Sequence, residues 1–388
     1  MRFFHLSDLH IGRHFHYYNM KEDQIHILNQ VVQAAKEEKP DAVVIAGDVY
    51  DKSVPSAEAV TVFNHFLTEL SALEPPIPVL IVSGNHDSAE RLEFASEILD
   101  RQKIYIAGVP PMDQEEKMKQ VEFEDEFGKI VFYLLPFVKP GYVRKVFGEG
   151  EEKDTYDGAV RGLIEREEIN PGVRNVLVSH QFYTSGGQEP IRSDSETVSV
   201  GGLEQVDVSC LDVFDYAALG HIHRRQKIGE KHAWYCGTPL KYSVSESRDE
   251  KVLTLVELRE KGRDPLIQTI VLSPLRDVRK EEGTLEEILK RAGQEEGKSR
   301  MDDYVSVTLT DEKELYQPRE QLEQAFPFLL EVKIDNARMR RQIREEEEAF
   351  DLSDPFKVFA QFFEEMQGRS MDAGEEAVLK NILEEEIL

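Results

Sequence analysis

The chain has 388 residues, 40% of them hydrophobic, and a formal net charge of −28 at pH 7. This length predicts two or three domains with a sizeable core, and the acidic charge argues against a protein that binds nucleic acid through its own cations. The two cysteines, Cys210 and Cys236, form neither a CxxC motif nor a zinc-finger pattern, so we expect no disulfide framework and a reducing compartment.

The chain offers no candidate membrane segment, because no apolar run approaches the ~18–20 residues of a membrane span. Its first residues run directly into a strand-like segment, without the basic region and cleavage site of a signal peptide. We therefore expect a cytoplasmic protein with no membrane partner.

Residues 1–272 alternate strand-like and helix-like segments. Apolar runs predict strands at residues 2–6, 42–46, 79–82, 104–106, 130–135, 176–179, 216–219, 233–236, 252–258 and 267–272. Apolar residues at helical spacing predict helices at 23–38 and 56–73. The first half is βαβ-like and the second half is richer in strands, so we expect an α/β fold in which helices flank a β-sandwich.

The dipeptide Ser273-Pro274 marks the expected start of a smaller domain over residues 273–338. Thr284 and Glu287 have capping-box spacing and predict a short helix. Alternating residues predict strands at 304–309 and 329–334 around a helix at 318–326. We expect a small α+β capping domain, and we find no catalytic constellation in it.

Residues 339–388 predict a linker and a helical tail. Residues 338–348 form a highly charged run, Asp354-Pro355 supplies an N-cap with proline at the first helical position, and a second helix starts at Asp372. The first helix carries one apolar face, formed by Phe356, Phe359, Phe362, Phe363 and Met366. Such a pair could pack on its own domain, but the phenylalanine density after a charged linker favours a groove on a partner.

Short polar motifs follow five of the predicted strands. They are Asp8-Leu9-His10, Gly47-Asp48, Gly84-Asn85-His86-Asp87, His180 at the end of Val176-Leu177-Val178-Ser179, and Gly220-His221-Ile222-His223. The carboxyl edge of an open α/β sheet is where ligand sites form. Two divalent metals about 3.5–4 Å apart can hold both oxygens of a phosphate displacement, and this mixture of carboxylate, amide and imidazole suits Mn²⁺, Fe or Zn²⁺.

The order of these motifs resembles that of the calcineurin-like metallophosphoesterases. The resemblance implies two metals in each chain, with the first held by Asp8, His10, Asp48 and His223. It assigns the second metal to Asn85, His180 and His221, and it makes Asp48 the bridging ligand. Because residues at i and i+2 of an extended segment share a side, His221 and His223 can each reach one of two adjacent metals.

The whole layout is similar to the SbcD family of bacterial DNA double-strand-break repair nucleases. The resemblance rests on "HLSDLHIG", "GDVYDKSVPS", "SGNHDS", "ALGHIHRRQ" and "YCGTPLKYSVSE", together with the small second domain and the Phe-rich tail. It implies Mn²⁺-dependent cleavage of DNA, exonucleolytic at duplex ends and endonucleolytic at hairpins and single strands. It also implies an SbcC-type coiled-coil ATPase bound by the tail, and a homodimer within a heterotetramer.

One position departs from the pattern of archaeal and eukaryotic relatives, in which a histidine often occupies the place of Asp51. The run Gly47-Asp48-x-x-Asp51 instead looks like the protein-phosphatase pattern, in which the second aspartate orients the histidine of the Gly-Asn-His motif. We therefore expect Asp51 to accept a hydrogen bond from His86. His86 itself should bind no metal, and should stabilise the phosphate or protonate the leaving oxygen.

Two other functions are compatible with parts of this pattern. A small-molecule or cyclic-nucleotide phosphodiesterase of the same superfamily would be less troubled by the acidic charge, but it needs no Phe-rich tail. A metal-free binding scaffold is disfavoured, because such proteins typically lose ligand residues and this chain keeps all seven.

Overall fold

The structure is a computed structural model that describes residues 1–147, 154–196, 204–295, 302–337 and 355–385. The chain divides into two compact units, one of residues 1–280 with 302–305 and one of residues 281–301 with 306–388. The predicted linker at 338–348 and the predicted N-cap Asp354 lie outside the described residues. The three-part division at 272 and 338 stays a prediction.

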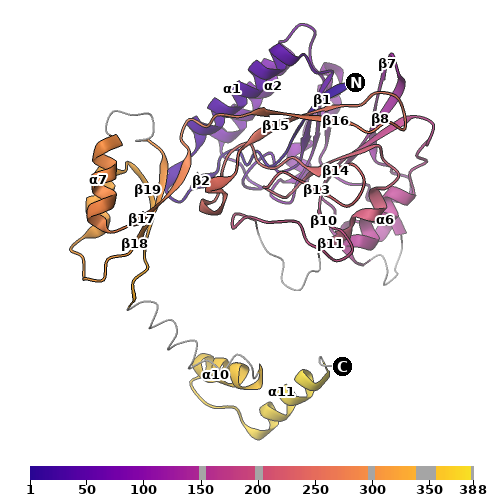
Figure 1. Ribbon diagram of the computed structural model, residues 1–388. Coiled ribbons are helices and arrows are strands. Elements are labelled where there is room, and N and C mark those ends of the chain that lie inside the picture. The colour runs from indigo at the N-terminus through magenta and orange to yellow at the C-terminus, as the bar shows by residue number, and fades with distance from the viewer. Residues whose placement is uncertain (148–153, 197–203, 296–301, 338–354, 386–388) are drawn as a thin grey trace. The chain divides into compact units, whose positions relative to one another are not determined.

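Two six-stranded sheets form the centre of the first unit (Figure 1). The first has the order β16 (Leu266–Val271), β15 (Val252–Glu257), β1 (Arg2–Leu6), β4 (Ala42–Ala46), β5 (Val79–Val82) and β6 (Ile104–Ala107). The second has the order β13 (Gln226–Ile228), β14 (Ala233–Tyr235), β12 (Tyr216–Gly220), β9 (Arg174–His180), β8 (Gly128–Leu135) and β7 (Lys119–Asp125). The predicted α/β fold with a central β-sandwich is confirmed.

One hydrophobic core lies between the two sheets. The ring of Phe3 on β1 meets Phe132 of the second sheet edge to face, with centroids 5.3 Å apart, and Tyr216 at 5.8 Å. His5 follows on the same side of β1, and its Nδ1 lies 3.0 Å from the hydroxyl of Tyr216. Strand β4 is buried at all five positions, which explains its unbroken apolar run.

Helices flank this sandwich (Figure 1). Helices α1 (Lys21–Glu38) and α2 (Ala57–Ser71) lie side by side, while α6 (Tyr156–Glu165) packs Val160 and Leu163 into a second core with Leu177 of β9. The shorter elements of the first unit are β2 (His14–Phe15), β3 (Tyr18–Asn19), α3 (Ala89–Leu92), α4 (Ser96–Leu99), α5 (Arg144–Phe147), β10 (Phe182–Thr184) and β11 (Gln205–Asp207).

Every strand and helix predicted over residues 1–272 is present, with ends that shift by at most two residues. Strand β7 and helix α6 were not predicted, and neither were the shorter elements β2, β3, β10, β11, β13, α3, α4 and α5. Strand β7 lies at the sheet edge beside β8, and its exposed positions are Gln120, Glu122 and Glu124, so it lacks the apolar run that marks a central strand. Among the described residues, no helix combines the length and apolarity needed to cross a bilayer.

The remaining elements include a three-stranded sheet of order β17 (Val278–Gly283), β18 (Tyr304–Leu309) and β19 (Phe328–Ile334). The second unit also contains α7 (Leu285–Glu295), α8 (Pro318–Ala325), α10 (Pro355–Gln367) and α11 (Ala373–Glu385). The predicted capping box before α7 is formed, because Thr284 N–H donates to the Glu287 carboxylate and Glu287 N–H donates to Thr284 Oγ1.

Candidate active site

The five polar motifs converge at the carboxyl ends of the strands that precede them. The loops after β1 and β4 run side by side, since His10 N–H donates to Asp48 O (3.0 Å) and Ile11 N–H donates to Val49 O (2.9 Å). In the second sheet, His180 on β9 is the register partner of Gly220 on β12. The structure therefore brings all seven predicted ligands together: Asp8, His10, Asp48, Asn85, His180, His221 and His223.

One group of donor atoms forms around His10. Its Nε2 lies 3.2 Å from Nε2 of His223 and 3.6 Å from Oδ2 of Asp48. Asp8, His10 and His223 each offer a ligand atom within 4.8 Å of the other two, and all three side chains are buried. The Asp8 carboxylate also accepts the backbone N–H of His221 at 3.1 Å, so the loop after β12 is fixed against it.

A second group forms around Asn85. Its Oδ1 lies 3.1 Å from Nε2 of His180 and 3.0 Å from Nδ1 of His221. Nε2 of His180 is also 3.5 Å from Oδ2 of Asp48. The same carboxylate oxygen of Asp48 thus belongs to both groups, while its other oxygen accepts the backbone N–H of His86 at 2.9 Å.

The spacing and chemistry of these atoms fit divalent metal ions. Two ligand atoms about 2.1 Å from one tetrahedral ion lie about 3.4 Å apart, and the separations here run from 3.0 to 3.6 Å. Nδ1 of His180 is 2.8 Å from the carbonyl of Ala46, a contact that leaves Nε2 free to bind a metal.

The backbone around the cluster has positive φ angles, which residues other than glycine rarely adopt. Asp8, His10, Asp48 and His221 have φ values of +53°, +43°, +49° and +101°. Such residues cost about 1–3 kcal/mol each and cluster at functional sites. Gly84 is required by space, because a Cβ there would lie 2.0 Å from Oδ1 of Asp48.

Burial sets the protonation of most of these histidines. Burial lowers the pKa of His10 and of His221 to about 3, and it lowers that of His223 well below its usual value, so these rings are neutral and able to bind a metal. His180 differs, because the charges of Asp48 and Asp8 outweigh its burial and raise its pKa to about 9. The pKa of Asp48 is lowered well below its usual value by the imidazole groups around it, despite its burial.

Comparison with known sequences identifies the family to which this chain belongs. Residues 1–225, which contain every cluster residue, match the family model described as calcineurin-like phosphoesterase, and residues 272–367 match SbcD_C, described as the type 5 capsule protein repressor C-terminal domain. The chain is 31% identical over 334 residues to the SbcD component of the nuclease SbcCD of Staphylococcus epidermidis, covering 85% of this chain and 84% of that protein. The chain is a calcineurin-like phosphoesterase of the SbcD family.

Two solved structures resemble this phosphoesterase more weakly than the sequence relative does. GAP50, the anchor in the inner membrane complex of Plasmodium, has 12% identity and a TM-score of 0.42 over 86% of this chain and 96% of that one. The NAD nucleotidase of Haemophilus influenzae has 12% identity and a TM-score of 0.32 over 90% of this chain and 60% of that one. The family assignment rests on the sequence matches alone.

The contact between His86 and Asp51 differs from the prediction. Nδ1 of His86 lies 3.0 Å from the backbone carbonyl of Asp51, not from its carboxylate. The carboxylate of Asp51 instead accepts a 2.8 Å bond from the guanidinium of Arg13 and lies 3.8 Å from Nδ1 of His10. The loop after β4 therefore orients His86 through its main chain, and the predicted carboxylate–imidazole dyad is not formed.

Three further residues support the site without having been predicted to do so. The carboxylate of Asp87 accepts the backbone N–H groups of Val49, Tyr50 and Gly84, so it ties together the loops after β4 and β5. Ser195 and Glu196 contact His223 from a distant loop. Only Asp87 carries a sequence signal, its place in the Gly-Asn-His-Asp motif, whereas the loop around Ser195 has no motif.

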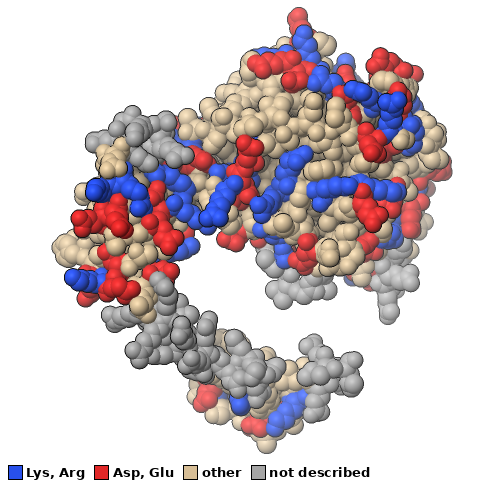
Figure 2. Space-filling model, viewed as in Figure 1, with Lys and Arg blue, Asp and Glu red and all other residues tan. Residues whose placement is uncertain are grey.

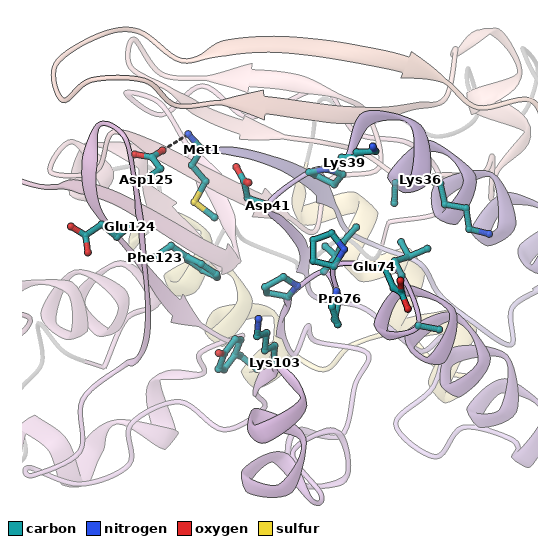
Figure 3. Close-up of a pocket in the computed structure, with 18 of the residues that line it drawn as sticks. Met1, Lys36, Lys39, Asp41, Glu74, Pro76, Lys103, Phe123, Glu124 and Asp125 are labelled. Carbon is teal, nitrogen blue, oxygen red and sulfur yellow. Dashed lines mark hydrogen bonds and ion pairs between the residues drawn. The ribbon is translucent and has the colours of Figure 1, made fainter.

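A cavity of about 710 Å³ lies at the opposite ends of the same strands (Figure 3). Asp41, Pro78 and Lys103, which directly precede β4, β5 and β6, line it together with Pro76 and Phe123. A concave pocket of this size is the usual first candidate for a ligand site. It contains none of the seven cluster residues, so the metal-ligating chemistry lies at the other edge of the sheet.

Proposed function

We propose that this chain is the Mn²⁺-dependent nuclease component of a DNA end-processing complex. The observation that carries the proposal is the position of Asp48, whose Oδ2 lies 3.6 Å from His10 Nε2 and 3.5 Å from His180 Nε2. A carboxylate oxygen shared by two groups of ligand atoms is the arrangement that suits a two-metal phosphoesterase.

The seven cluster residues divide into two ligand sets in this proposal. Asp8, His10 and His223 would hold one Mn²⁺, Asn85, His180 and His221 would hold the other, and Asp48 would contact both. A bound metal pair supplies a nucleophilic water near neutral pH and neutralises charge on the phosphate. All seven residues fall within residues 1–225, the part of the chain that matches the phosphoesterase family model, and this match supports the assignment.

His86 would handle the proton of the leaving oxygen. Its side chain is half-buried, and its ring meets that of His10 edge to face with centroids 4.8 Å apart. The Asp51 carbonyl accepts from Nδ1–H, so Nε2 is the atom that can take up and deliver a proton. This role needs His86 to stay off the metals, although its ring nitrogen lies within reach of His10 and Asp48.

The relative from Staphylococcus epidermidis is named as part of SbcCD, which supports two partners for this chain. We propose that DNA is the substrate and that an SbcC-type coiled-coil ATPase binds α10 and α11, with a homodimer of this chain in a heterotetramer. More than half of the net negative charge falls in residues 281–388. On the visible face of the first unit, Lys and Arg side chains lie among Asp and Glu (Figure 2), and the partner would supply further cations for the DNA.

The test is a nuclease assay with Mn²⁺ on blunt duplex, hairpin and single-stranded DNA, with and without the coiled-coil ATPase. The proposal predicts exonuclease activity at duplex ends and endonuclease activity at hairpins and single strands. Bis-p-nitrophenyl phosphate and a cyclic nucleotide serve as small-molecule substrates in parallel. Turnover of the cyclic nucleotide without cleavage of any DNA would favour a small-molecule phosphodiesterase, and no turnover of any substrate with any divalent metal would favour a binding scaffold.

A further inference from the structure

The loop of residues 191–196 holds His223 at two atoms. Oγ of Ser195 lies 2.7 Å from Nδ1 of the His223 ring. The neighbouring Glu196 accepts the backbone N–H of His223 at 2.8 Å. His223 follows strand β12, so a distant segment of the chain fixes both the ring and the main chain of this residue.

A buried ion pair lies behind Ser195. Nζ of Lys251 is 2.6 Å from Oε2 of Glu246, and their side chains are 8% and 1% exposed. The same ammonium group donates to Thr238 Oγ1 (2.8 Å) and to the carbonyl of His223 (3.1 Å), so each of its three hydrogens has an acceptor. Glu246 is thereby held as a carboxylate, whose other oxygen is 2.9 Å from Oγ of Ser195.

These contacts determine where the protons lie. Oγ of Ser195 also lies 2.8 Å from Oγ of Ser193, which has a hydroxyl hydrogen of its own to donate. The Glu246 carboxylate can only accept, so the single hydroxyl hydrogen of Ser195 goes to Glu246. Oγ of Ser195 must then accept from His223, which places the ring hydrogen of the neutral imidazole on Nδ1. The lone pair of Nε2 is left on the side of His10, whose Nε2 is 3.2 Å away.

We infer that Ser195 is a positioning residue that fixes the Nδ1–H tautomer of His223 and thereby sets the metal affinity of the Asp8–His10–His223 group. This inference rests on the proposed metal centre. It assigns the Glu246–Lys251 pair a specific purpose, which is to hold the Ser195 hydroxyl in one orientation. Outer partners of this kind typically change metal affinity 10–100-fold.

The test compares Ser195→Thr with Ser195→Val, two side chains of nearly the same shape of which only threonine keeps the hydroxyl. Titration of the metal-free chain with Mn²⁺ should show one of two sites weakened 10–100-fold in Ser195→Val and close to wild type in Ser195→Thr. The ¹⁵N spectrum of histidine-labelled, metal-free protein should show a protonated Nδ1 for His223 in the wild type and a mixture of tautomers in Ser195→Val.

Ser245→Ala is the matched control, because Ser245 Oγ accepts the backbone N–H of Asp194 and anchors the same loop without touching His223. It should leave both Mn²⁺ affinities unchanged. Equal weakening in the Thr, Val and Ser245→Ala variants would overturn the inference, because loop anchoring would then explain the effect. Two wild-type affinities in Ser195→Val would overturn the inference alone, whereas a wild-type chain that binds no Mn²⁺ would overturn the proposed function with it.

Discussion

The polar cluster and the α10–α11 pair differ in how far their side chains are buried within their own unit. Five of the seven cluster side chains are buried, with Asp8, His10 and His180 fully covered and Asp48 2% exposed. On α10, by contrast, Phe359, Phe362 and Met366 are 49%, 56% and 67% exposed. The cluster is already ordered by the core of its own unit and has room only for small ions. The helices instead expose apolar side chains, which a partner protein would have to cover.

Part of the apolar face of α10 is covered within the helix pair itself. The ring of Phe356 lies under Nζ of Lys380 from α11 at 4.9 Å, and the ring of Phe363 lies under Arg369 at 5.0 Å. The exposed set is therefore Phe359, Phe362 and Met366 on α10, with Val378 and Ile382 on α11. A partner groove is expected to contact this set, and Phe356 and Phe363 stabilise the pair itself.

The largest effect should follow from Asp48→Asn. Loss of the carboxylate shared by both ligand groups removes several kcal/mol of charge stabilisation, and each ~1.4 kcal/mol is a factor of ten. We expect Mn²⁺-dependent cleavage of DNA to fall by about 10³-fold or more, with the thermal unfolding midpoint close to wild type. Asp41→Asn, at the other end of β4, should leave activity unchanged; equal losses in both variants would mean that the cluster is not the catalytic site.

His86→Gln should separate proton transfer from metal binding. A general acid typically contributes about 10²–10⁴-fold to the rate, so we expect that loss in the rate of DNA cleavage with unchanged Mn²⁺ stoichiometry and DNA affinity. If the variant lost a metal and kept its turnover per bound metal, His86 would be a ligand and the assignment would be wrong.

Asp51→Asn serves as the matched control for His86. The contact to His86 Nδ1 comes from the Asp51 carbonyl, which this substitution keeps. The substitution removes only the negative charge that faces Arg13 and Nδ1 of His10. We therefore expect the activity to fall less than about tenfold, below the range of a general acid. A loss as large as that of His86→Gln would point to a carboxylate–imidazole dyad in the working enzyme.

The double substitution Phe359→Glu with Met366→Glu should weaken the binding of the α10–α11 pair to its proposed partner. Each buried Phe or Met contributes roughly 1.5–3 kcal/mol, so affinity for the coiled-coil ATPase should fall by about 10²–10⁴-fold. Hydrolysis of bis-p-nitrophenyl phosphate by the isolated chain should stay at the wild-type level. The exposed Gln361→Glu on the same helix is the control, and native ATPase binding by the double variant would show that this face is not the interface.

A further effect is expected on the pH dependence of metal binding. His180 has a pKa raised to about 9 and must lose its proton before Nε2 can bind a metal, so raising the pH favours binding. We expect the Mn²⁺ affinity of one site to rise by up to about tenfold per pH unit between pH 7 and 9. Calorimetry in buffers of different ionisation enthalpy should record about one proton released; affinity that stayed flat over this range would contradict the account.

Local patterns predicted much of this molecule. The predicted capping box Thr284–Glu287 spans three residues and is formed. The ligand residues follow strand ends, and the parallel register that aligns Gly220 with His180 brings those ends together. These features depend on short stretches of chain, so the sequence contains them.

Other contacts depend on how distant loops pass one another, and no pattern contained them. Ser195 meets His223 across 28 positions and Glu246 across 51. The position of the Asp51 carbonyl, which replaces its carboxylate at His86, follows from the backbone path after a left-handed Asp48. The separation of Phe359 from Phe356 and Phe363 required the positions of Lys380 and Arg369, which lie over the latter two rings.

Anomalous scattering from crystals grown at saturating Mn²⁺ would show whether Asp48 joins two metal sites in one chain. We expect two peaks in each chain, one on either side of the Asp48 carboxylate, and loss of at least one peak in Asp48→Asn. A single peak, or two peaks that both leave Asp48 uncontacted, would contradict it.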